Sequence, residues 1–125
     1  MPSTDQMRAV VEGYVAGFEA ADLDALVGLF ADNATVEDPV GGGQVLQGKD
    51  AIREFYGFSI STGAKLAMLG EPRCAGDYVA FPFTVTLDWE GARQVIEVID
   101  TFRIDDAGKI TEMRAFWGPE NMKPA

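Results

Sequence analysis

The spacing of hydrophobic residues changes near the middle of this chain, and that change restricts the fold more than any other feature of the sequence. In the first half, apolar residues recur every three or four positions, as on one face of a helix. In the second half they alternate with polar residues, as in strands that bury one face. Helices followed by a run of strands indicate an α+β protein.

Three helices are expected in the first half. The first begins after Ser3 or Thr4, either of which can cap it. Its apolar stripe consists of Met7, Val10, Val11, Tyr14, Val15 and Phe18. A second, shorter helix follows Asp22, with an apolar face formed by Leu23, Leu26, Val27 and Phe30. The third covers about residues 49–59, and one of its faces carries Ile52, Phe55, Tyr56 and Ile60.

The remaining segments are expected to be strands. One covers residues 34–38, is ended by Pro39 and the glycines at 41–43, and pairs with a short strand at 45–47. The strands of the second half cover residues 64–69, 73–74, 78–89, 92–104 and 109–117. Two-residue and four-residue turns join the last three, at 90–91 and 105–108. We expect a curved antiparallel sheet that forms an open cone, with three helices across it and an apolar pocket between.

The absence of histidine excludes many catalytic mechanisms. The 125 residues contain no histidine and one cysteine, Cys74. Ser-His-Asp and Cys-His nucleophile systems, ordinary zinc sites and internal disulfides are therefore excluded. We expect no metal and no cofactor, because no set of ligands is visible in the sequence. Any acid–base chemistry must come from carboxylates, tyrosines or lysines whose pKa values the fold has shifted.

Length and charge narrow the cellular role. The length suits one domain over residues 1–125. A formal net charge of −10 argues against nucleic acid and anionic membranes as partners. The sequence has no signal-peptide pattern and no apolar run of the roughly 20 residues that a membrane span needs. We expect a cytoplasmic protein with no membrane insertion and a small-molecule partner.

Strand alternation places three proton-active side chains on apolar faces. On the strand at 92–104, Asp100 shares its face with valine, isoleucine and phenylalanine, while both arginines lie on the opposite face. On the strand at 34–38, Asp38 shares its face with Val36. Tyr14 lies on the apolar stripe of the first helix. Taken singly, Tyr14 could be a core tyrosine, Asp38 a turn residue, and Asp100 a buried acid paired with an arginine.

Taken together, the three groups indicate a reaction class. A buried carboxyl without a cation keeps its proton, because desolvation raises its pKa, so Asp100 would be a hydrogen-bond donor like Tyr14. Asp38, at a strand end, is better solvated and can remain a base. Two neutral donors and one carboxylate around an apolar pocket suit proton abstraction next to a carbonyl, with the donors holding the enolate oxygen.

These residues resemble those of the ketosteroid isomerases of the NTF2-like superfamily. Residues 22–35 are similar to a segment common across the superfamily and support the fold. The segments 36–41, 52–56 and 98–100, together with Tyr14, are more specific to the isomerases. The resemblance covers nearly the whole chain, from about residue 7 to residue 121. It implies a cofactor-independent homodimer that acts on a steroid.

The resemblance also implies a role for each residue. Asp38 would be the general base that moves a proton from C4 to C6 of a 3-oxo-Δ5-steroid and so produces the 3-oxo-Δ4-steroid. Tyr14 and protonated Asp100 would form the oxyanion hole for the dienolate, and Tyr56 would support Tyr14. Phe30 stands where some members carry a further tyrosine, which implies a shorter hydroxyl network here. The implied substrate-binding positions are Phe30, Phe55, Phe81, Phe83, Val85, Val98, Met113, Ala115 and Trp117.

Two other classes of function stay open at this point. One is another NTF2-like pocket enzyme, such as a cyclase, dehydratase or epoxide hydrolase. Such enzymes often use a histidine or an Asp-Arg-Asp water site, and this chain has no histidine. The other is a non-catalytic steroid- or lipid-binding dimer module, which would not need two aspartates and a tyrosine facing its interior.

Overall fold

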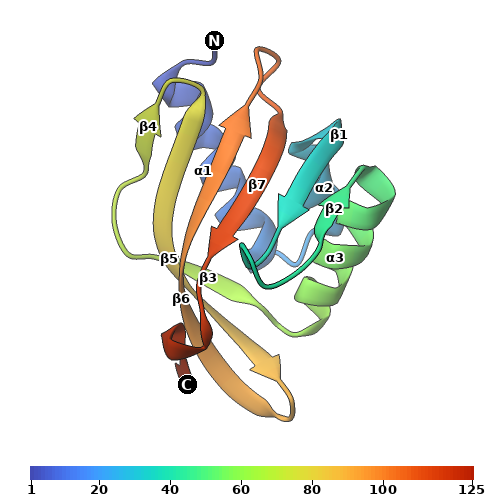
Figure 1. Cartoon of the computed structure of the whole chain (residues 1–125), viewed down its shortest axis with the longest axis vertical. Helices are drawn as coiled ribbons and strands as arrows, with labels where there is room; N and C mark the ends of the chain where they lie inside the picture. Colours follow the sequence, from blue (N-terminus) through green and yellow to red (C-terminus); the bar gives the residue numbers. More distant parts are fainter.

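The computed structural model covers all 125 residues. It contains three α-helices, one short 3₁₀ helix and eight strands. The helices are α1 (Thr4–Glu19), α2 (Leu23–Gly28), α3 (Lys49–Ser61) and η1 (Pro119–Asn121). The strands are β1 (Phe30–Glu37), β2 (Val45–Gln47), β3 (Lys65–Met68), β4 (Arg73–Ala75), β5 (Tyr78–Trp89), β6 (Ala92–Ile104), β7 (Ile110–Phe116) and β8 (Met122–Pro124). The α+β class with three helices on a curved, unclosed sheet is confirmed (Figure 1).

Helix α1 follows the prediction closely. Ser3 caps it, and a reciprocal bond between the Gln6 side chain and the Ser3 backbone completes a capping box. All members of the predicted stripe are buried except Val15, which is half-buried. Burial of this stripe fixes α1 against the concave face of the sheet, where its Tyr14 reaches the interior of the cone.

The prediction that Phe30 belongs to the second helix was wrong. Helix α2 ends at Gly28, and Phe30 is the first residue of β1, where it pairs with Ile110. Two lysines from distant positions satisfy carbonyls at the end of this helix: Lys49 Nζ and Lys109 Nζ donate to the carbonyls of residues 27 and 28 at 2.8 and 2.7 Å. The apolar spacing continued past this end by chance.

The sheet is mixed, and the purely antiparallel prediction was wrong at one pairing. Its strand order is β2-β1-β7-β6-β5-β3, with β4 paired to β5 and β8 to β6. Strand β1 runs parallel to β7, while every other pair is antiparallel. After β1 the chain passes through β2 and α3 and forms β3 to β6. Only then does it add β7 beside β1 (Figure 1).

The long hairpin of β5 and β6 forms the centre of the sheet. Its predicted bounds are confirmed, and its tip is the two-residue turn Glu90–Gly91, with φ of 51° and 82°. Both residues have positive φ, as a type I′ turn requires. The even-numbered positions of β6 from residue 96 to residue 104 are all buried, and Asp100 among them is 1% exposed. Strand alternation therefore predicted correctly that Asp100 faces the interior.

The C-terminal segment was not predicted to be structured. After β7 the chain forms η1 and then β8, which pairs with residues 94–96 of β6. This pairing places Met122 against the core. It also holds the chain end across the outer half of the β5–β6 hairpin (Figure 1). No helix of the protein is both long and apolar enough to cross a membrane.

Candidate active site

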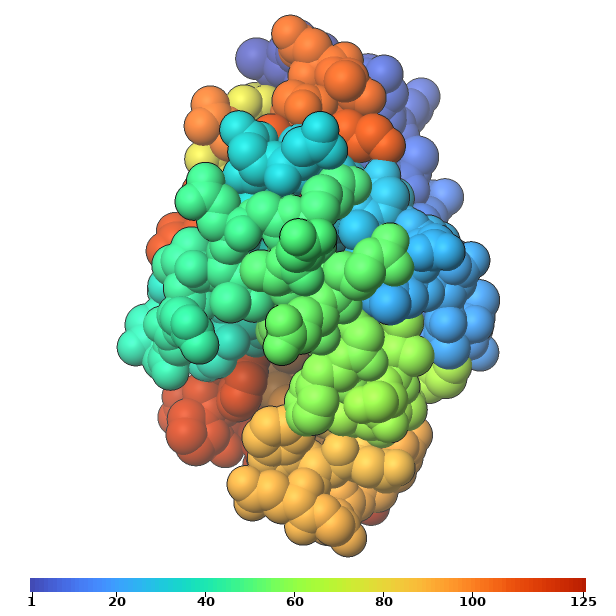
Figure 2. Space-filling model, turned by 90° about the vertical axis from the view of Figure 1, so that its right-hand side faces the viewer, coloured from blue at the N-terminus to red at the C-terminus, as the bar shows by residue number.

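A pocket lies between α1, α3 and the concave face of the sheet. Its volume is about 220 Å³, far more than the space that single buried waters occupy, so it is a binding cavity and not a packing defect. Fifteen of its 19 lining residues are hydrophobic. A narrow opening is visible where α3, the β5–β6 hairpin and the C-terminal segment meet (Figure 2).

Asp100 reaches this pocket from the middle of β6. It pairs with Phe81 on β5 and with Ala115 on β7, so apolar neighbours flank it on both sides. Its Oδ1 atom is buried and has no hydrogen-bond partner in the protein. Buried polar atoms are nearly always paired, and an unpaired one that lines a cavity indicates a place where a ligand makes the missing bond.

Asp38 reaches the same pocket from the residue after β1. The N–H of Val40 donates to the carbonyl of Ala115 at 2.9 Å, which attaches the loop beside Asp38 to β7. Ala115 in turn pairs with Asp100 on the next strand. The two aspartates thus lie two strands apart in one row, about 10 Å between their Cα atoms from ordinary strand spacing.

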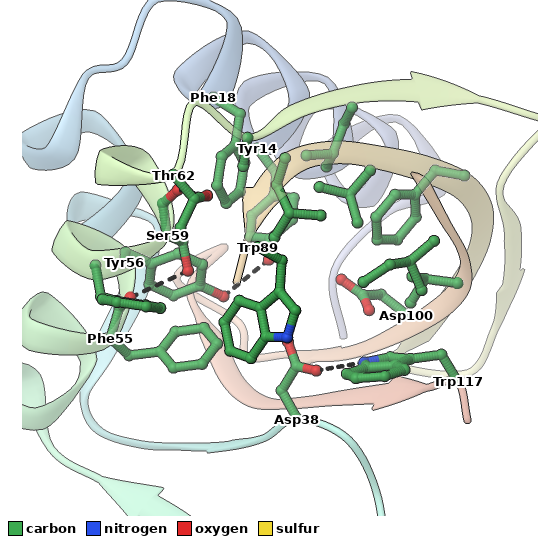
Figure 3. A pocket seen from close by; sticks show the side chains of 18 of the residues that line it. Tyr14, Phe18, Asp38, Phe55, Tyr56, Ser59, Thr62, Trp89, Asp100 and Trp117 are labelled. Carbon is green, nitrogen blue, oxygen red and sulfur yellow. Dashed lines mark hydrogen bonds between the residues drawn. The ribbon is translucent and has the colours of Figure 1, made fainter. Parts of the chain in front are cut away.

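Trp117 holds the Asp38 carboxylate. Its indole N–H donates to Oδ1 of Asp38 at 2.7 Å, and the other oxygen, Oδ2, accepts no hydrogen bond from the protein (Figure 3). Trp117 follows β7 directly, so the same parallel pairing of β1 with β7 brings the indole and the carboxylate together. The sequence placed Trp117 among the pocket residues but did not predict this contact.

Tyr14 enters the pocket from α1 and shares a hydrogen bond with Tyr56 of α3. The two hydroxyl oxygens are 2.9 Å apart (Figure 3). Edge-to-face contacts with Phe18, Phe81 and Phe102, at ring separations of 5.0–6.1 Å, fix the Tyr14 ring. Phe30 packs on Tyr56 at 5.4 Å and supplies no hydroxyl, so the network has two tyrosines.

Burial shifts the pKa values of all four groups upward. It raises the pKa of Asp100 well above its ordinary value, and the nearby Asp38 carboxylate raises it further. Burial also raises the pKa of Asp38, but the hydrogen bond from Trp117 opposes this shift. The tyrosine pKa values are raised well above normal, chiefly by burial. The pocket therefore favours a neutral Asp100 and neutral tyrosines, and of the two aspartates only Asp38 has a hydrogen bond that stabilises its charged form.

The structure brings the predicted polar residues together but divides the predicted apolar ones. Five of the predicted apolar residues line the pocket with Tyr14, Asp38, Tyr56 and Asp100. They are Phe55, Phe83, Val85, Val98 and Trp117. Phe30, Phe81, Met113 and Ala115 are at most 1% exposed and belong to the core, not to the pocket wall. The lining residues that the sequence did not single out are Phe18, Phe58, Ser59, Thr62, Ala64, Leu66, Leu87, Trp89, Ile96 and Met122.

Some of these missed residues carried a usable signal. Phe55, Ser59 and Thr62 follow each other at i, i+4 and i+7, which is one stripe of α3. Two polar residues on the stripe concealed it from a search for apolar spacing. Met122 carried no signal, because only the pairing of β8 with β6 brings it to the wall.

The arrangement can take and return protons but offers no evident metal site. No three His, Cys, Asp or Glu side chains come together anywhere in the chain. A carboxylate with one free oxygen faces a cavity that also contains a carboxyl group and a tyrosine hydroxyl. Such a set can abstract a proton from a bound molecule and stabilise the negative charge that forms.

Comparisons with known proteins agree with this chemistry. Residues 11–113 match the SnoaL-like domain family. The chain is 38% identical over 117 residues to a steroid Delta-isomerase from Nocardioides simplex, with 94% of each chain covered. It is also 31% identical over 124 residues to the epoxide hydrolase LasB from Streptomyces lasalocidi, of which it spans 43%.

A solved structure adds a whole-chain comparison. The epoxide hydrolase/cyclase-like enzyme SalBIII, described as having a role in pyran ring formation in the polyether salinomycin, superposes with a TM-score of 0.92. The two chains are 29% identical, and both are covered completely. The proteins that this chain resembles in fold and in sequence are therefore enzymes, an isomerase and two of the epoxide hydrolase or cyclase type. The chain belongs to the SnoaL-like family within the NTF2-like superfamily, and it is a homologue of steroid Delta-isomerase.

Proposed function

We propose that the protein is a steroid Δ-isomerase that converts 3-oxo-Δ5-steroids into 3-oxo-Δ4-steroids. Asp38 Oδ2 takes a proton from C4, and the electron pair moves through C3 onto O3 to give a dienolate. Tyr14 and the protonated Asp100 donate hydrogen bonds to O3. Asp38 then returns the proton to C6, the double bond moves into conjugation, and no cofactor takes part.

One observation carries the proposal: two aspartates and a tyrosine line the same apolar cavity, and burial raises the pKa of Asp100 well above that of an ordinary carboxyl. The orphaned Asp100 Oδ1 supplies a donor without a partner, as an oxyanion hole requires. Tyr56 can donate to Tyr14 over 2.9 Å, which leaves the Tyr14 proton free for the substrate. The Trp117 bond opposes the effect of burial on the pKa of Asp38 and leaves Oδ2 for the transfer. The apolar wall suits a fused hydrocarbon skeleton.

The direct test is the rise in enone ultraviolet absorbance with 5-androstene-3,17-dione as substrate. Wild type should show turnover well above the buffer rate, and Asp38→Asn should lower kcat by about 10²–10⁴ because it removes the base. Asp32→Asn is a matched control, since Asp32 is exposed and outside the pocket. A wild-type rate equal to buffer would overturn the proposal.

Epoxide opening is a second candidate, because LasB and SalBIII, two of the similar proteins, are described as an epoxide hydrolase and an epoxide hydrolase/cyclase-like enzyme. Asp38 could activate a hydroxyl or water while Asp100 protonates the epoxide oxygen. The pocket wall, however, contains no arginine and no third carboxylate to hold an attacking water. Incubating the enzyme with a steroid 5,6-epoxide and with the Δ5 ketone separates the two activities. Turnover of the epoxide alone would support the alternative and contradict the isomerase.

We also propose that the active form is a homodimer built on the outer face of the sheet. Ile99 and Phe116 are paired neighbours there, 50% and 42% exposed, and Pro82 lies opposite Ile99 on β5. Leu69, the residue after β3, is 57% exposed and donates its backbone N–H to the carbonyl of Pro82. It therefore extends the apolar row beyond β5. A contiguous exposed apolar row suits a second copy of itself. Light scattering should give twice the 13.5 kDa chain mass, and Ile99→Lys should give the monomer.

A further inference from the structure

The pocket has a second polar group of residues, away from the two aspartates. Ser59 and Thr62 lie on the stripe of α3 that faces the cavity (Figure 3). Thr62, at 8% exposed, is buried and lines the pocket together with Asp100 and the two hydrogen-bonded tyrosines, Tyr14 and Tyr56. The proposed isomerisation gives Ser59 and Thr62 no role.

The hydrogen atoms of both hydroxyls are already used. Ser59 Oγ donates to the carbonyl of Phe55 at 3.1 Å, and Thr62 Oγ1 donates to the carbonyl of Ser59 at 2.6 Å. A hydroxyl has one hydrogen and two lone pairs, so each of these hydroxyls, while it keeps its bond to the backbone carbonyl, can accept a further hydrogen bond but has no hydrogen left to donate. A ligand group at this position would therefore need to be a donor. The indole N–H of Trp89 is the other polar hydrogen in this part of the pocket wall. Trp89 is the last residue of β5, at the tip of the β5–β6 hairpin, and is 39% exposed.

The position of these hydroxyls suits the far end of a steroid. Tyr56, which contacts the Tyr14 hydroxyl, lies six residues before Thr62 on α3. Six residues of α-helix rise about 9 Å, and a tyrosine side chain leans toward the N-terminus, which lengthens the separation. This separation is comparable to the long axis of the fused-ring skeleton, so a substrate held at O3 can direct its C17 substituent toward Thr62. Ser59, three residues from Tyr56 and about 4.5 Å along the helix axis, lies beside the same path.

We infer that Ser59 and Thr62 form a specificity subsite that favours a hydroxyl over a ketone at the end of the steroid remote from O3. This inference rests on the proposed function, because O3 must bind at Tyr14 and Asp100 to set the direction. A C17 hydroxyl donates its single hydrogen to one free lone pair of the subsite, that of Thr62 Oγ1 at the far end. A C17 ketone has only lone pairs. Neither the ketone oxygen nor the Ser59 and Thr62 hydroxyls then has a free hydrogen, so no hydrogen bond forms between them.

Calorimetric binding of 17β-estradiol and estrone tests the subsite without turnover, because the two share a phenol and differ only at C17. Wild type should prefer estradiol, and Thr62→Val should reduce the ratio of the two Kd values by about three- to tenfold, the worth of one neutral hydrogen bond. Ser59→Ala should reduce it less, because the single C17 hydrogen bonds chiefly to Thr62, and Thr62→Ser, which keeps the hydroxyl, should restore it. Ser61→Ala is the control, since Ser61 is exposed, outside the pocket, and bonded to the carbonyl of Phe58.

The outcomes separate this inference from the proposed function. A ratio that stays at the wild-type value in both Thr62→Val and Ser59→Ala, with both steroids bound, would overturn the subsite and leave the isomerase proposal standing. Failure of wild type to bind either steroid would contradict both. A ratio that falls equally in Ser61→Ala would show a general effect of α3 and would also reject the subsite.

Discussion

Two aspartates share this pocket, and their surroundings give them opposite properties. Asp38 accepts a hydrogen bond from Trp117, which stabilises its charged form, while Asp100 has no donor near Oδ1 and apolar neighbours on both adjoining strands. The same side chain can thus be a base at one position and a donor at the other. The difference comes from which strand supplies each residue.

The Tyr14 hydroxyl should contribute to the reaction far more than to stability. Tyr14→Phe removes one donor from the oxyanion hole, so kcat for Δ5-ketone isomerisation should fall by about 10²–10³. Tyr78→Phe is the matched control, because Tyr78 is 41% exposed and lies outside the pocket. Steady-state kinetics on both variants measures the effect, and equal kcat values for Tyr14→Phe and wild type would remove Tyr14 from the proposed mechanism.

Trp117 should set the pH at which the base becomes active. Its N–H lowers the pKa of Asp38 against the raising effect of burial, so Trp117→Phe should raise that pKa. Activity requires the carboxylate, so the acidic midpoint of the kcat/KM profile should move to higher pH. Trp89→Phe makes the same change at a pocket residue without the Asp38 bond and should leave the midpoint in place. A common midpoint for all three proteins would count against this role.

At the residue scale, the sequence predicted which face of an element a side chain lies on. It did not predict contacts that depend on the register between strands. The faces of Tyr14, Asp38 and Asp100 follow from local periodicity alone. The Trp117 contact depends on which residues of β1 and β7 lie side by side, and no local pattern carries that information.

At the scale of elements, α1 and α2 approach closely because α1 has a glycine at position 17. A Cβ on Gly17 would lie 2.7 Å from Cδ2 of Leu26, whose side chain is fully buried. Gly17→Ala should therefore lower the free energy of unfolding by about 1–3 kcal/mol despite the better helix propensity of alanine. Gly28→Ala in α2 meets no atom within 4 Å and should raise it by up to about 1 kcal/mol. Urea denaturation of both variants checks the pair; a stabilised Gly17→Ala would mean that the helices can separate at little cost.

The elements that were predicted wrongly share one cause. Phe30 was assigned to a helix because its spacing fits, yet Lys49 and Lys109, from distant positions, satisfy carbonyls at the end of that helix. The parallel pairing of β1 with β7 and the strand β8 likewise depend on contacts far apart in sequence. Helix α1 and the β5–β6 hairpin, which depend on local caps, alternation and a two-residue turn, were predicted well.

At the scale of the whole molecule, the buried carboxyl at residue 100 should cost stability as the pH rises. Asp100 has a raised pKa in the native state, whereas in the unfolded chain it titrates near the ordinary value of about 3.9. Between the two values the native state holds a proton that the unfolded state has lost, so raising the pH favours unfolding, by up to about 1.4 kcal/mol per pH unit.

Asp100→Asn keeps the size of the side chain and cannot titrate. The unfolding free energy of wild type minus that of Asp100→Asn, from urea titrations between about pH 4 and pH 8, should therefore be highest at pH 4 and decrease toward pH 8. A difference that stays constant or grows over this range would mean that Asp100 is ionised in the native protein, and an ionised Asp100 could not donate to an oxyanion.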